Sequence, residues 1–461
     1  MSDLSCKLLI LGGGPGGYVC AIRAGQLGVD TILIEPAPLG GTCLNVGCIP
    51  SKALIHVAEE FERIHHHAAS NPIGIAVGAP TLDLAAAMTW KDGIVSRLNG
   101  GIAGLLRKAG VRQVVGHARF RDGKTVEIAT SEGSRVVSAE TVVIATGSTS
   151  LALPGLPFGG DVLSSSEALS LREVPKSLAI VGGGYIGLEL GTAFAKLGST
   201  VTVLEAQGSI LPQYDAELVR PVATRLKALG VRVVTQALAK HYRDGALTYA
   251  EGGAEHRMEA EKVLVTVGRK ARLDGWGLEE LGLETNGASL RIDDQCRTSM
   301  RGVYAIGDVT GEPMLAHRAM AQGEMVAEIA AGQKRRWDKR CIPAVCFTDP
   351  EIVSVGLSPV DAEAQGLPFE IGRFPLAANA RSQTMEAGEG FVRVVSRPGD
   401  HLLLGIQAVG AGVSELSGAF ALAVETGLRL EDISGTIHAH PTRSEGFQEA
   451  ALGALGRALH A

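Results

Sequence analysis

The chain carries the same pattern of apolar and polar positions in two places. An apolar run leads into a glycine-rich turn, then a stretch with apolar residues at helical spacing, then a second apolar run. This order is typical of a βαβ unit in a parallel sheet, and a doubly wound sheet follows from it. The two copies predict strands at 7–11 and 31–35 around a helix ending near 27, and strands at 178–181 and 201–205 around a helix ending near 197. The repeat is therefore a duplicated supersecondary unit.

The rest of the chain predicts a mixture of helices and short strands. The further helices are expected at 50–66, 82–108, 414–426 and 444–460, and the further strands at 113–115, 126–128, 141–145, 344–347, 391–395 and 402–409. The last part has no glycine-rich turn of the βαβ kind, so it predicts an α+β domain with an assembly role. The fold class expected is α/β, with two Rossmann-like dinucleotide-binding domains and a C-terminal α+β dimerisation domain.

Domain limits follow from where these patterns change. A length of 461 residues corresponds to about three domains at roughly 150 residues each. The stretch 151–160 is rich in glycine and proline and predicts a linker. We expect a first nucleotide domain at 1–150, a second at 151–272, a central segment at 273–340 that returns to the first domain, and an interface domain at 341–461.

Composition excludes several classes of protein. Hydrophobic residues make up 46% of the chain, enough for several cores, and a net charge of −6 spread along the chain argues against a nucleic-acid partner. There is no run of 18 apolar residues, so no membrane span is expected. Seven scattered cysteines and no secretory signal argue against a secreted disulfide scaffold. We expect a cytoplasmic protein.

Both turns fit the spacing G-x-G-x-x-G with an acidic residue 18 positions after the third glycine. The first glycine makes the turn, the second lets backbone N–H groups approach a pyrophosphate, and the third lets helix and strand pack closely. The acidic residue accepts a hydrogen bond from a ribose hydroxyl. The residues are Gly12, Gly14, Gly17 and Glu35 in the first copy, and Gly182, Gly184, Gly187 and Glu205 in the second. Two copies predict two dinucleotides, of which FAD with NAD or NADP is the usual pair.

Glu205 bears on the choice of nicotinamide cofactor. A carboxylate there repels a 2′-phosphate, and residues 206–211 contain no arginine or lysine to bind one. The second site therefore favours NAD over NADP.

Cys43 and Cys48 are separated by four residues just before a predicted helix. A bond closing so short a loop restricts the unfolded chain little, so it is a poor structural staple. A helix N-terminus beside Cys48 stabilises its thiolate. Zinc binding fits badly, because a second pair of ligands is missing nearby. The pair predicts a redox-active disulfide next to the first nucleotide.

Together these motifs resemble the flavoprotein disulfide reductases, in order and over essentially the whole chain. The motifs are the run Cys43–Lys52, the two glycine fingerprints, Ala145-Thr146-Gly147, Ala305–Asp308 and His438-Ala439-His440-Pro441. Within that family, the chain is most similar to members that oxidise dihydrolipoyl groups with NAD⁺ in 2-oxo acid dehydrogenase complexes. The stretches Trp90–Val95 and Met314–Glu328 are most similar to bacterial members that serve branched-chain 2-oxo acid complexes.

The resemblance implies a role for each catalytic residue. Cys43 receives the substrate thiol, Cys48 lies against the flavin, His440 is the base, and Glu445 orients it. The base comes from the other subunit in this family, so an obligate homodimer is implied, with lipoyl domains and a peripheral-subunit-binding domain as partners. From the residues alone, His438 and His440 are also compatible with a structural role, and less with a metal site.

Further cofactor-binding residues are carried over from the family alone. Lys52 is expected to pair with Glu189 beside the flavin, and Tyr185 to screen the flavin from nicotinamide; simple packing is the alternative for these three. The other expected contacts are Ala118, Gly147, Asp308 and Ala316 for FAD, and Gly268 for NAD.

Arg443 departs from the family pattern, which has an apolar residue there, so the resemblance leaves open how the substrate is recognised. Three other functions stay open. A glutathione-type or mercuric-type reductase lacks support because basic residues for a 2′-phosphate are missing. A flavin transhydrogenase would not need the two cysteines, and a purely structural subunit would not need the base.

Overall fold

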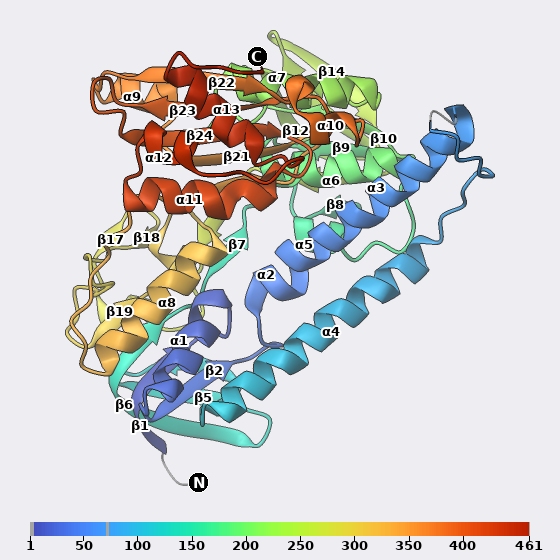
Figure 1. Ribbon diagram of the computed structural model, residues 1–461. Helices are drawn as coiled ribbons and strands as arrows, with labels where there is room; N and C mark the ends of the chain where they lie inside the picture. Colours follow the sequence, from blue (N-terminus) through green and yellow to red (C-terminus); the bar gives the residue numbers. More distant parts are fainter. Residues whose placement is uncertain (1–3, 71–72, 461) are drawn as a thin grey trace. The chain divides into compact units, whose positions relative to one another are not determined.

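The computed structural model describes residues 4–70 and 73–460, and the chain forms two compact units. Unit 1 joins the chain up to Glu173 to the segment Val267–Asp338, and unit 2 joins Val174–Thr266 to the chain from Lys339 onward. Figure 1 gives the element labels used below.

Unit 1 is built on a mainly parallel sheet in the order β3-β2-β1-β6-β5-β4, with β19 paired to β6. Strand β1 is buried on both faces: Leu8, Leu9, Ile10 and Leu11 have no exposed surface. This explains why its sequence is a continuous apolar run without alternation. The parallel strands are β1 (Leu4–Leu11), β2 (Thr31–Glu35), β3 (Arg112–Val115), β6 (Gly133–Ile144) and β19 (Val303–Ala305), and the antiparallel ones are β4 (His117–Phe120) and β5 (Thr125–Thr130).

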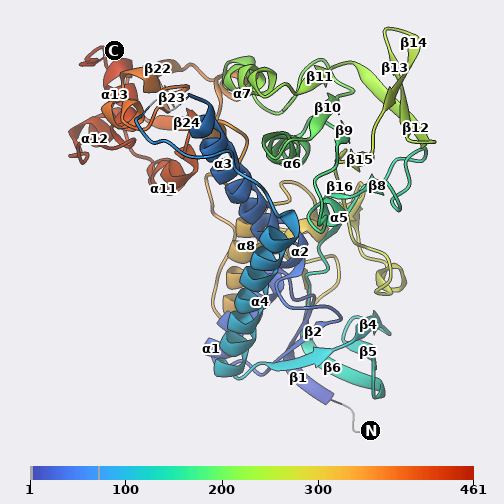
Figure 2. The same ribbon diagram turned by 90° about the vertical axis from the view of Figure 1, so that its right-hand side faces the viewer.

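Two helices that are far apart in sequence pack closely in unit 1. Helix α1 (Pro15–Gln26) lies beside α8 (Ala316–Ala330), as Figures 1 and 2 both show. A Cβ on Gly323 would lie 2.4 Å from the Gly16 carbonyl oxygen, so only small residues allow this approach. The other helices are α2 (Gly41–Val46), α3 (Cys48–Ser70), α4 (Leu84–Lys108) and α5 (Ser165–Ala168), with the 3₁₀ turns η1 (Leu278–Leu281) and η2 (Gly307–Thr310). The small strands are β7 (Ser148–Ser150), β8 (Val162–Leu163), β16 (Arg269–Ala271), β17 (Thr285–Asn286) and β18 (Ser289–Leu290).

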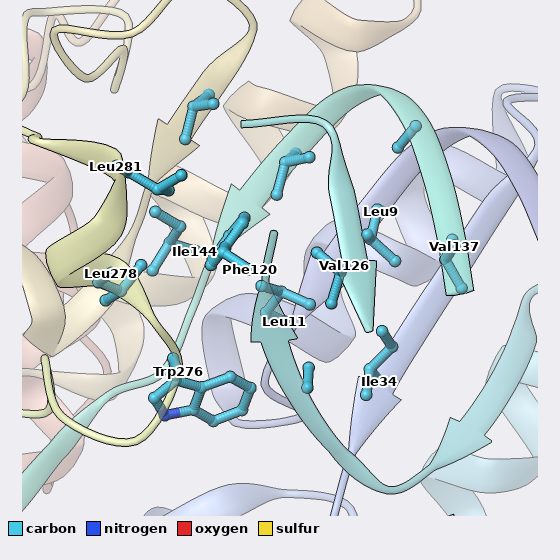
Figure 3. Packing of buried hydrophobic residues seen from close by; sticks show 14 of the residues in the cluster. Leu9, Leu11, Ile34, Phe120, Val126, Val137, Ile144, Trp276, Leu278 and Leu281 are labelled. Carbon is cyan, nitrogen blue, oxygen red and sulfur yellow. The ribbon is translucent and has the colours of Figure 1, made fainter. Parts of the chain in front are cut away.

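The segment after residue 267 completes the core of the first sheet. Trp276, Leu278 and Leu281 are buried in the same cluster as Leu11 and Ile144 (Figure 3). The sequence predicted that 273–340 returns to the first nucleotide domain, and this cluster is the contact expected of such a segment.

Residues 151–173 belong to unit 1 because they contact helix α4. The buried Lys91 ammonium donates to the Leu169 carbonyl oxygen at 2.8 Å, and Arg172 pairs with Asp92 at 2.6 Å. The compact unit therefore extends past the glycine- and proline-rich stretch at 151–160. The domain limits at 150, 272 and 340 stay predictions.

Unit 2 contains a second parallel sheet and two antiparallel ones. The parallel order is β11-β10-β9-β15, from β9 (Ser177–Val181), β10 (Thr200–Leu204), β11 (Arg232–Val234) and β15 (Lys262–Val265), with helices α6 (Tyr185–Lys196) and α7 (Ala216–Ala228). A small antiparallel sheet contains β12 (Ala237–Arg243), β13 (Ala246–Glu251) and β14 (Ala254–Glu259).

The C-terminal part of unit 2 is an antiparallel sheet covered by helices. The order is β20-β21-β24-β23-β22. The strands are β20 (Ala344–Cys346), β21 (Glu351–Gly356), β22 (Glu370–Pro375), β23 (Phe391–Ser396) and β24 (Leu403–Gly410). The helices and 3₁₀ turns are α9 (Pro359–Ala364), η3 (Leu376–Ala378), α10 (Ala380–Gln383), η4 (Val413–Leu416), α11 (Ser417–Thr426), α12 (Leu430–Gly435) and α13 (Glu445–Ala454).

Ion pairs hold the two halves of unit 2 together. The buried Arg393 guanidinium pairs with Asp215 at 2.5 Å and with Glu217 at 3.0 Å. The Asp349 carboxylate forms ion pairs with the buried Lys196 ammonium and with the Arg225 guanidinium, each at 2.8 Å. Because burial makes an unpaired charge costly, these contacts fix helices α6 and α7 against the C-terminal part of unit 2.

One predicted helix is too long. The sequence predicted a helix at 444–460, whereas α13 ends at Ala454. Gly456 has φ of +67°, which turns the chain out of the helix, and His460 folds back to bond Glu449 at 2.7 Å. In the part of the chain that the structure describes, no helix is long and apolar enough to cross a membrane.

Candidate functional site

Four predicted residues of unit 1 lie at the carboxyl edge of its parallel sheet. Gly12 follows β1, Glu35 ends β2, Gly147 follows β6, and Asp308 follows β19. These strands run parallel, so their carboxyl ends share one edge. In open α/β sheets this edge is where ligands bind.

The first glycine loop has the shape that a pyrophosphate needs. Gly12 has φ of +106°, and a Cβ there would lie 2.3 Å from the Ala145 carbonyl oxygen. A Cβ on Gly17 would lie 1.8 Å from the Gly12 carbonyl oxygen, so helix α1 packs directly on the turn. Gly14 caps the helix, and its nearest neighbour is a Cα atom at 3.9 Å. Space therefore remains at the helix N-terminus, and the loop fits a dinucleotide.

The second glycine loop repeats this geometry in unit 2. Gly182 has φ of +105°, and a Cβ on Gly187 would lie 2.4 Å from the Gly182 carbonyl oxygen. Gly184 caps α6, with nothing within 4 Å of a Cβ built on it. The second loop fits a dinucleotide in the same way.

The acidic residues of both copies are fixed by backbone N–H groups. Glu35 accepts from Gly13 at 2.6 Å and from Ala37 at 3.0 Å. Glu205 accepts from Gly183 at 2.6 Å and from Gln207 at 2.8 Å. Each carboxylate thus holds its own glycine turn in addition to the predicted ribose contact, a second role that the sequence reasoning missed.

Asp308 is held by residues that the sequence did not indicate. The Ser148 hydroxyl donates to Asp308 at 2.5 Å and accepts from Arg269 at 2.8 Å. The preceding Gly307 N–H donates to the buried side chain of Gln322 at 2.8 Å. Neither contact has a local sequence signal, because the partners lie far along the chain.

The remaining predicted cofactor contacts lie at recognisable places. Ala118 lies in β4, two residues after Gly116, whose N–H donates to the Glu35 carbonyl oxygen at 3.4 Å. Ala316 is the first residue of α8. Gly268 has φ of +127° and follows β15 in the chain. Their cofactor contacts stay predictions.

The cysteine pair is built onto the first glycine loop. The Gly40 N–H donates to the Gly13 carbonyl oxygen at 2.8 Å, and a Cβ on Gly41 would lie 2.6 Å from the Gly14 Cα. Cys43 lies in α2 and is half-buried, whereas Cys48 opens α3 and is exposed. The pair thus lies beside a helix start and the first glycine loop, and its redox role stays a prediction.

The two thiols have different electrostatic surroundings. A hydrogen bond to Cys48, followed by burial, raises the pKa of the Cys43 thiol, and Lys52 only partly opposes this. The Cys43 thiol therefore holds its proton more firmly than a free thiol does. Burial raises the pKa of Cys6 to about 11 and that of Cys296 to about 12, which makes them unreactive core thiols.

Asn45, which lies between the two cysteines, bonds the backbone that precedes Cys43. Its amide donates to the carbonyl oxygens of Leu39 at 3.0 Å and Gly41 at 2.9 Å, and its oxygen accepts from Asn99 of α4 at 2.8 Å. The sequence reasoning did not single out Asn45 or Asn99.

In unit 2, the predicted base and its predicted orienting residue are bonded. His440 Nδ1 lies 2.8 Å from one oxygen of Glu445, and the Thr442 N–H donates to the other at 2.8 Å. Burial alone would raise the pKa of Glu445, but the bonds from Thr442 and His440 outweigh it and hold this pKa below its usual value. Because the carboxylate contacts Nδ1, the other ring nitrogen of His440, Nε2, takes no part in this contact and can accept a proton.

His438 and Arg443, on either side of His440, contact their own domain. The His438 ring meets Phe447 edge-on at 6.5 Å. The Arg443 guanidinium lies where a Cβ of Gly412 would be and donates to the Met385 sulfur at 3.6 Å. Burial raises the pKa of the half-buried Glu351, an effect that hydrogen bonds from Ser414 and the charge of Arg443 oppose, so the unusual arginine carries a charge that favours the ionised acid.

Lys52 and Glu189 belong to different units, so their pairing stays a prediction. Lys52 lies in the first turns of α3. Glu189 is buried in α6 and accepts from the Phe347 N–H at 2.9 Å, while Tyr185 opens α6. In the described residues, no three His, Cys, Asp or Glu side chains gather as a metal site requires.

Comparison with known proteins decides the family. The model for pyridine nucleotide-disulphide oxidoreductases matches residues 6–323, and the model for their dimerisation domain matches residues 342–451. The chain belongs to this family. The predicted family resemblance and fold class are thereby confirmed, as are FAD and NAD as the cofactors that the family uses.

Several relatives in the pyridine nucleotide-disulphide oxidoreductase family match over nearly the full length. A dihydrolipoyl dehydrogenase of Pseudomonas aeruginosa is 58% identical, with 99% of each chain covered. Dihydrolipoyl dehydrogenase 2 of Haloarcula marismortui is 46% identical, with 98% of each covered. That of Geobacillus stearothermophilus is 43% identical, covering 99% of this chain and 98% of the relative.

Solved structures of more distant sequence have the same fold. LpdA from Mycobacterium tuberculosis superposes with a TM-score of 0.88 at 27% identity, covering 97% of this chain and 99% of that one. The HOCl-induced flavoprotein disulfide reductase RclA from Escherichia coli gives 0.84 at 26% identity, covering 95% and 98%.

Proposed function

We propose that this chain is a dihydrolipoyl dehydrogenase, the E3 component of a 2-oxo acid dehydrogenase complex. It oxidises protein-bound dihydrolipoyl groups and passes the electrons to NAD⁺. The observation that carries this function is the bond from Gly40 to Gly13, which ties the cysteine loop to the first nucleotide loop. A cysteine pair built onto a dinucleotide site is suited to exchange electrons with a dithiol substrate.

The first step is proton removal by His440. Its Nε2 takes the proton of one dihydrolipoyl thiol, and Glu445 stabilises the imidazolium that forms. Only the thiolate is a competent nucleophile, so this step sets the rate of attack.

Thiol–disulfide exchange follows in two displacements. The substrate thiolate attacks Cys43 of the oxidised pair, which breaks the bond to Cys48 and releases Cys48 as a thiolate. The second substrate thiol then loses its proton and attacks the substrate sulfur of the mixed disulfide, which forms the lipoyl disulfide and releases Cys43, whose sulfur takes up that proton. Two electrons have passed from the substrate to the cysteines.

The cofactors complete the reaction from the two glycine loops. The first loop would hold FAD, which when bound would supply an acceptor for the electron pair of the reduced cysteines, and the second loop would hold the NAD⁺ that finally receives it. Glu205 would repel a 2′-phosphate there, which favours NAD. Lys52, Glu189 and Tyr185 are assigned to the contact between these cofactors, and Ala118, Gly147, Asp308, Ala316 and Gly268 to holding them.

The assembly proposed is a cytoplasmic homodimer with one base supplied across the interface to each cysteine pair. Its partners are lipoyl domains and a peripheral-subunit-binding domain. The dimerisation domain at 342–451 supports the dimer. Service to a branched-chain 2-oxo acid complex rests on the stretches 90–95 and 314–328 alone.

Steady-state reduction of NAD⁺ by dihydrolipoamide tests the activity. We expect activity with NAD⁺ and little with NADP⁺, and loss of activity in Cys43→Ser and His440→Gln. His438→Gln is the matched control, because His438 lies two residues away without an assigned role. Activity that survives both substitutions would contradict the proposal.

Mixing the two inactive variants tests the shared site. After subunit exchange, half of the dimers are mixed, and each mixed dimer has one site with no defect, so about a quarter of the sites recover. If cysteines and base came from the same subunit, no activity would return.

A further inference from the structure

A buried asparagine ties the loop that holds His440 to the C-terminal sheet domain. Asn379 follows strand β22 and caps helix α10, and it is 3% exposed. Its oxygen accepts from the Ser382 N–H at 2.9 Å and from the Ser382 hydroxyl at 3.1 Å. Its amide nitrogen donates to the Thr442 carbonyl oxygen at 3.0 Å.

Thr442 connects this asparagine to the acid–base pair. Its N–H donates to Glu445 at 2.8 Å, and the other oxygen of Glu445 lies 2.8 Å from His440 Nδ1. Its hydroxyl donates to the Ala439 carbonyl oxygen at 2.7 Å. A continuous series of hydrogen bonds therefore leads from Asn379 through Thr442 and Glu445 to His440.

The exposure of His440 makes this series important. The side chain of His440 is 71% exposed, whereas that of Glu445 is 23% exposed. Within this chain, packing restrains the imidazole little, so its direction depends on the Glu445 bond and on the loop backbone. A reacting group displaced by about 1 Å can lose about a hundredfold in rate.

Asn379 is well suited to hold the loop because its own position is fixed. The Ser382 N–H and hydroxyl lock the amide in one orientation, and Ser382 is fully buried. A neutral amide also adds no charge near the imidazole, so its effect is geometric.

We propose that Asn379 is a positioning residue for the base His440, acting through Thr442 and Glu445. The proposal rests on the proposed function, in which His440 deprotonates the dihydrolipoyl thiol. Asn379 touches neither substrate nor cofactor in this account.

Three variants separate positioning from simple stability. Asn379→Ser keeps a good helix cap for α10, since serine and asparagine cap equally well, but its hydroxyl is too short to reach Thr442. Asn379→Ala loses both the cap and the bond. Ser358→Ala removes the cap of α9 in the same domain, where the Ser358 hydroxyl accepts from Asp361 at 3.1 Å, without touching the His440 loop.

Each holoenzyme is assayed in both halves of the reaction. Rapid mixing with dihydrolipoamide without oxygen gives the rate of flavin reduction from the thiol side, which needs the base. Oxidation of NADH by ferricyanide gives the rate of the nicotinamide side of the reaction, which does not need the base.

We expect Asn379→Ser and Asn379→Ala to slow the thiol side by roughly tenfold or more while the NADH side stays within twofold of wild type. Ser358→Ala should leave both sides near wild type. A wild-type thiol-side rate in Asn379→Ser would overturn the proposal, because the residue would then only cap α10. An equal loss in Ser358→Ala would overturn it in favour of general destabilisation. If dihydrolipoamide fails to reduce the wild-type flavin, the proposed function fails and this inference falls with it.

Discussion

In the two glycine loops, single glycine-to-alanine substitutions can separate an effect on packing from an effect on cofactor binding. In each fingerprint, a Cβ on the third glycine would clash with backbone, whereas a Cβ on the second would meet nothing closer than 3.9 Å. Alanine at the third position should therefore damage folding, and alanine at the second should damage cofactor binding alone.

The distances set the size of the effect at the third position. A Cβ on Gly17 lies 1.8 Å from the Gly12 oxygen, whereas real contacts stay above 3.0 Å, so the loop must open by at least 3.0 − 1.8 = 1.2 Å. For Gly187, the corresponding shift is 3.0 − 2.4 = 0.6 Å. Overpacking of this kind costs about 1–3 kcal/mol, partly offset by the better helix propensity of alanine, about 1 kcal/mol. The loss in free energy of unfolding should thus be near the upper end of this range for Gly17→Ala and near the lower end for Gly187→Ala.

The second position predicts a different result. Gly14 and Gly184 have φ of −69° and −76°, which alanine adopts without strain. Gly14→Ala should change the stability of the FAD-free protein by less than about 1 kcal/mol. Its methyl group lies where the pyrophosphate approaches the backbone, so FAD should bind at least about tenfold more weakly, which is about 1.4 kcal/mol. Gly184→Ala should instead raise the KM for NAD⁺ and leave FAD binding unchanged.

Urea unfolding of the FAD-free protein and titration with FAD measure the two effects separately. The reasoning would be refuted if Gly14→Ala bound FAD as tightly as wild type, or if Gly17→Ala unfolded at the wild-type urea concentration.

Further predictions concern the acid–base pair and a buried ion pair. Glu445→Gln removes the charge that stabilises the protonated His440, so the thiol-side rate should fall about tenfold to a hundredfold with the NADH side unchanged; equal rates in a rapid-mixing experiment would contradict the role of Glu445. Burial alone would raise the pKa of Asp349, but Lys196 and Arg225 outweigh it and hold this pKa below its usual value. Such a carboxylate contributes stability above its unfolded pKa of about 4 and loses that contribution as the pH falls through the folded pKa. Asp349→Asn should therefore cost about 1–3 kcal/mol at pH 7, the lower end reflecting partial exposure, and in thermal unfolding the difference from wild type should shrink as the pH falls below about 4. A difference that stayed constant as the pH fell further would contradict the ion-pair explanation.

Local patterns predicted elements of the two βαβ units well. The strand predicted at 31–35 is β2 as found, and both glycine turns adopt the positive φ values that their spacing implies. These features depend on residues close in sequence, so their physical causes are visible in the chain itself.

Features that depend on distant residues escaped prediction. Strand β14 is mostly exposed, so it lacks the alternation of apolar residues that reveals a strand. Asn379 bonds Thr442, 63 residues away, and Ser148 bonds Asp308, 160 residues away. Such pairs have no local signal, since only the folded sheet brings them together.

Anaerobic titration with dihydrolipoamide, followed by NAD⁺, tests the central claim most directly. We predict that dihydrolipoamide produces a long-wavelength absorption band from the Cys48 thiolate beside oxidised flavin, and that NAD⁺ discharges the reduced enzyme with formation of NADH. If dihydrolipoamide leaves the flavin unchanged while NADPH bleaches it, the substrate and the preference assigned to Glu205 are both wrong, and a glutathione-type reductase becomes the better account.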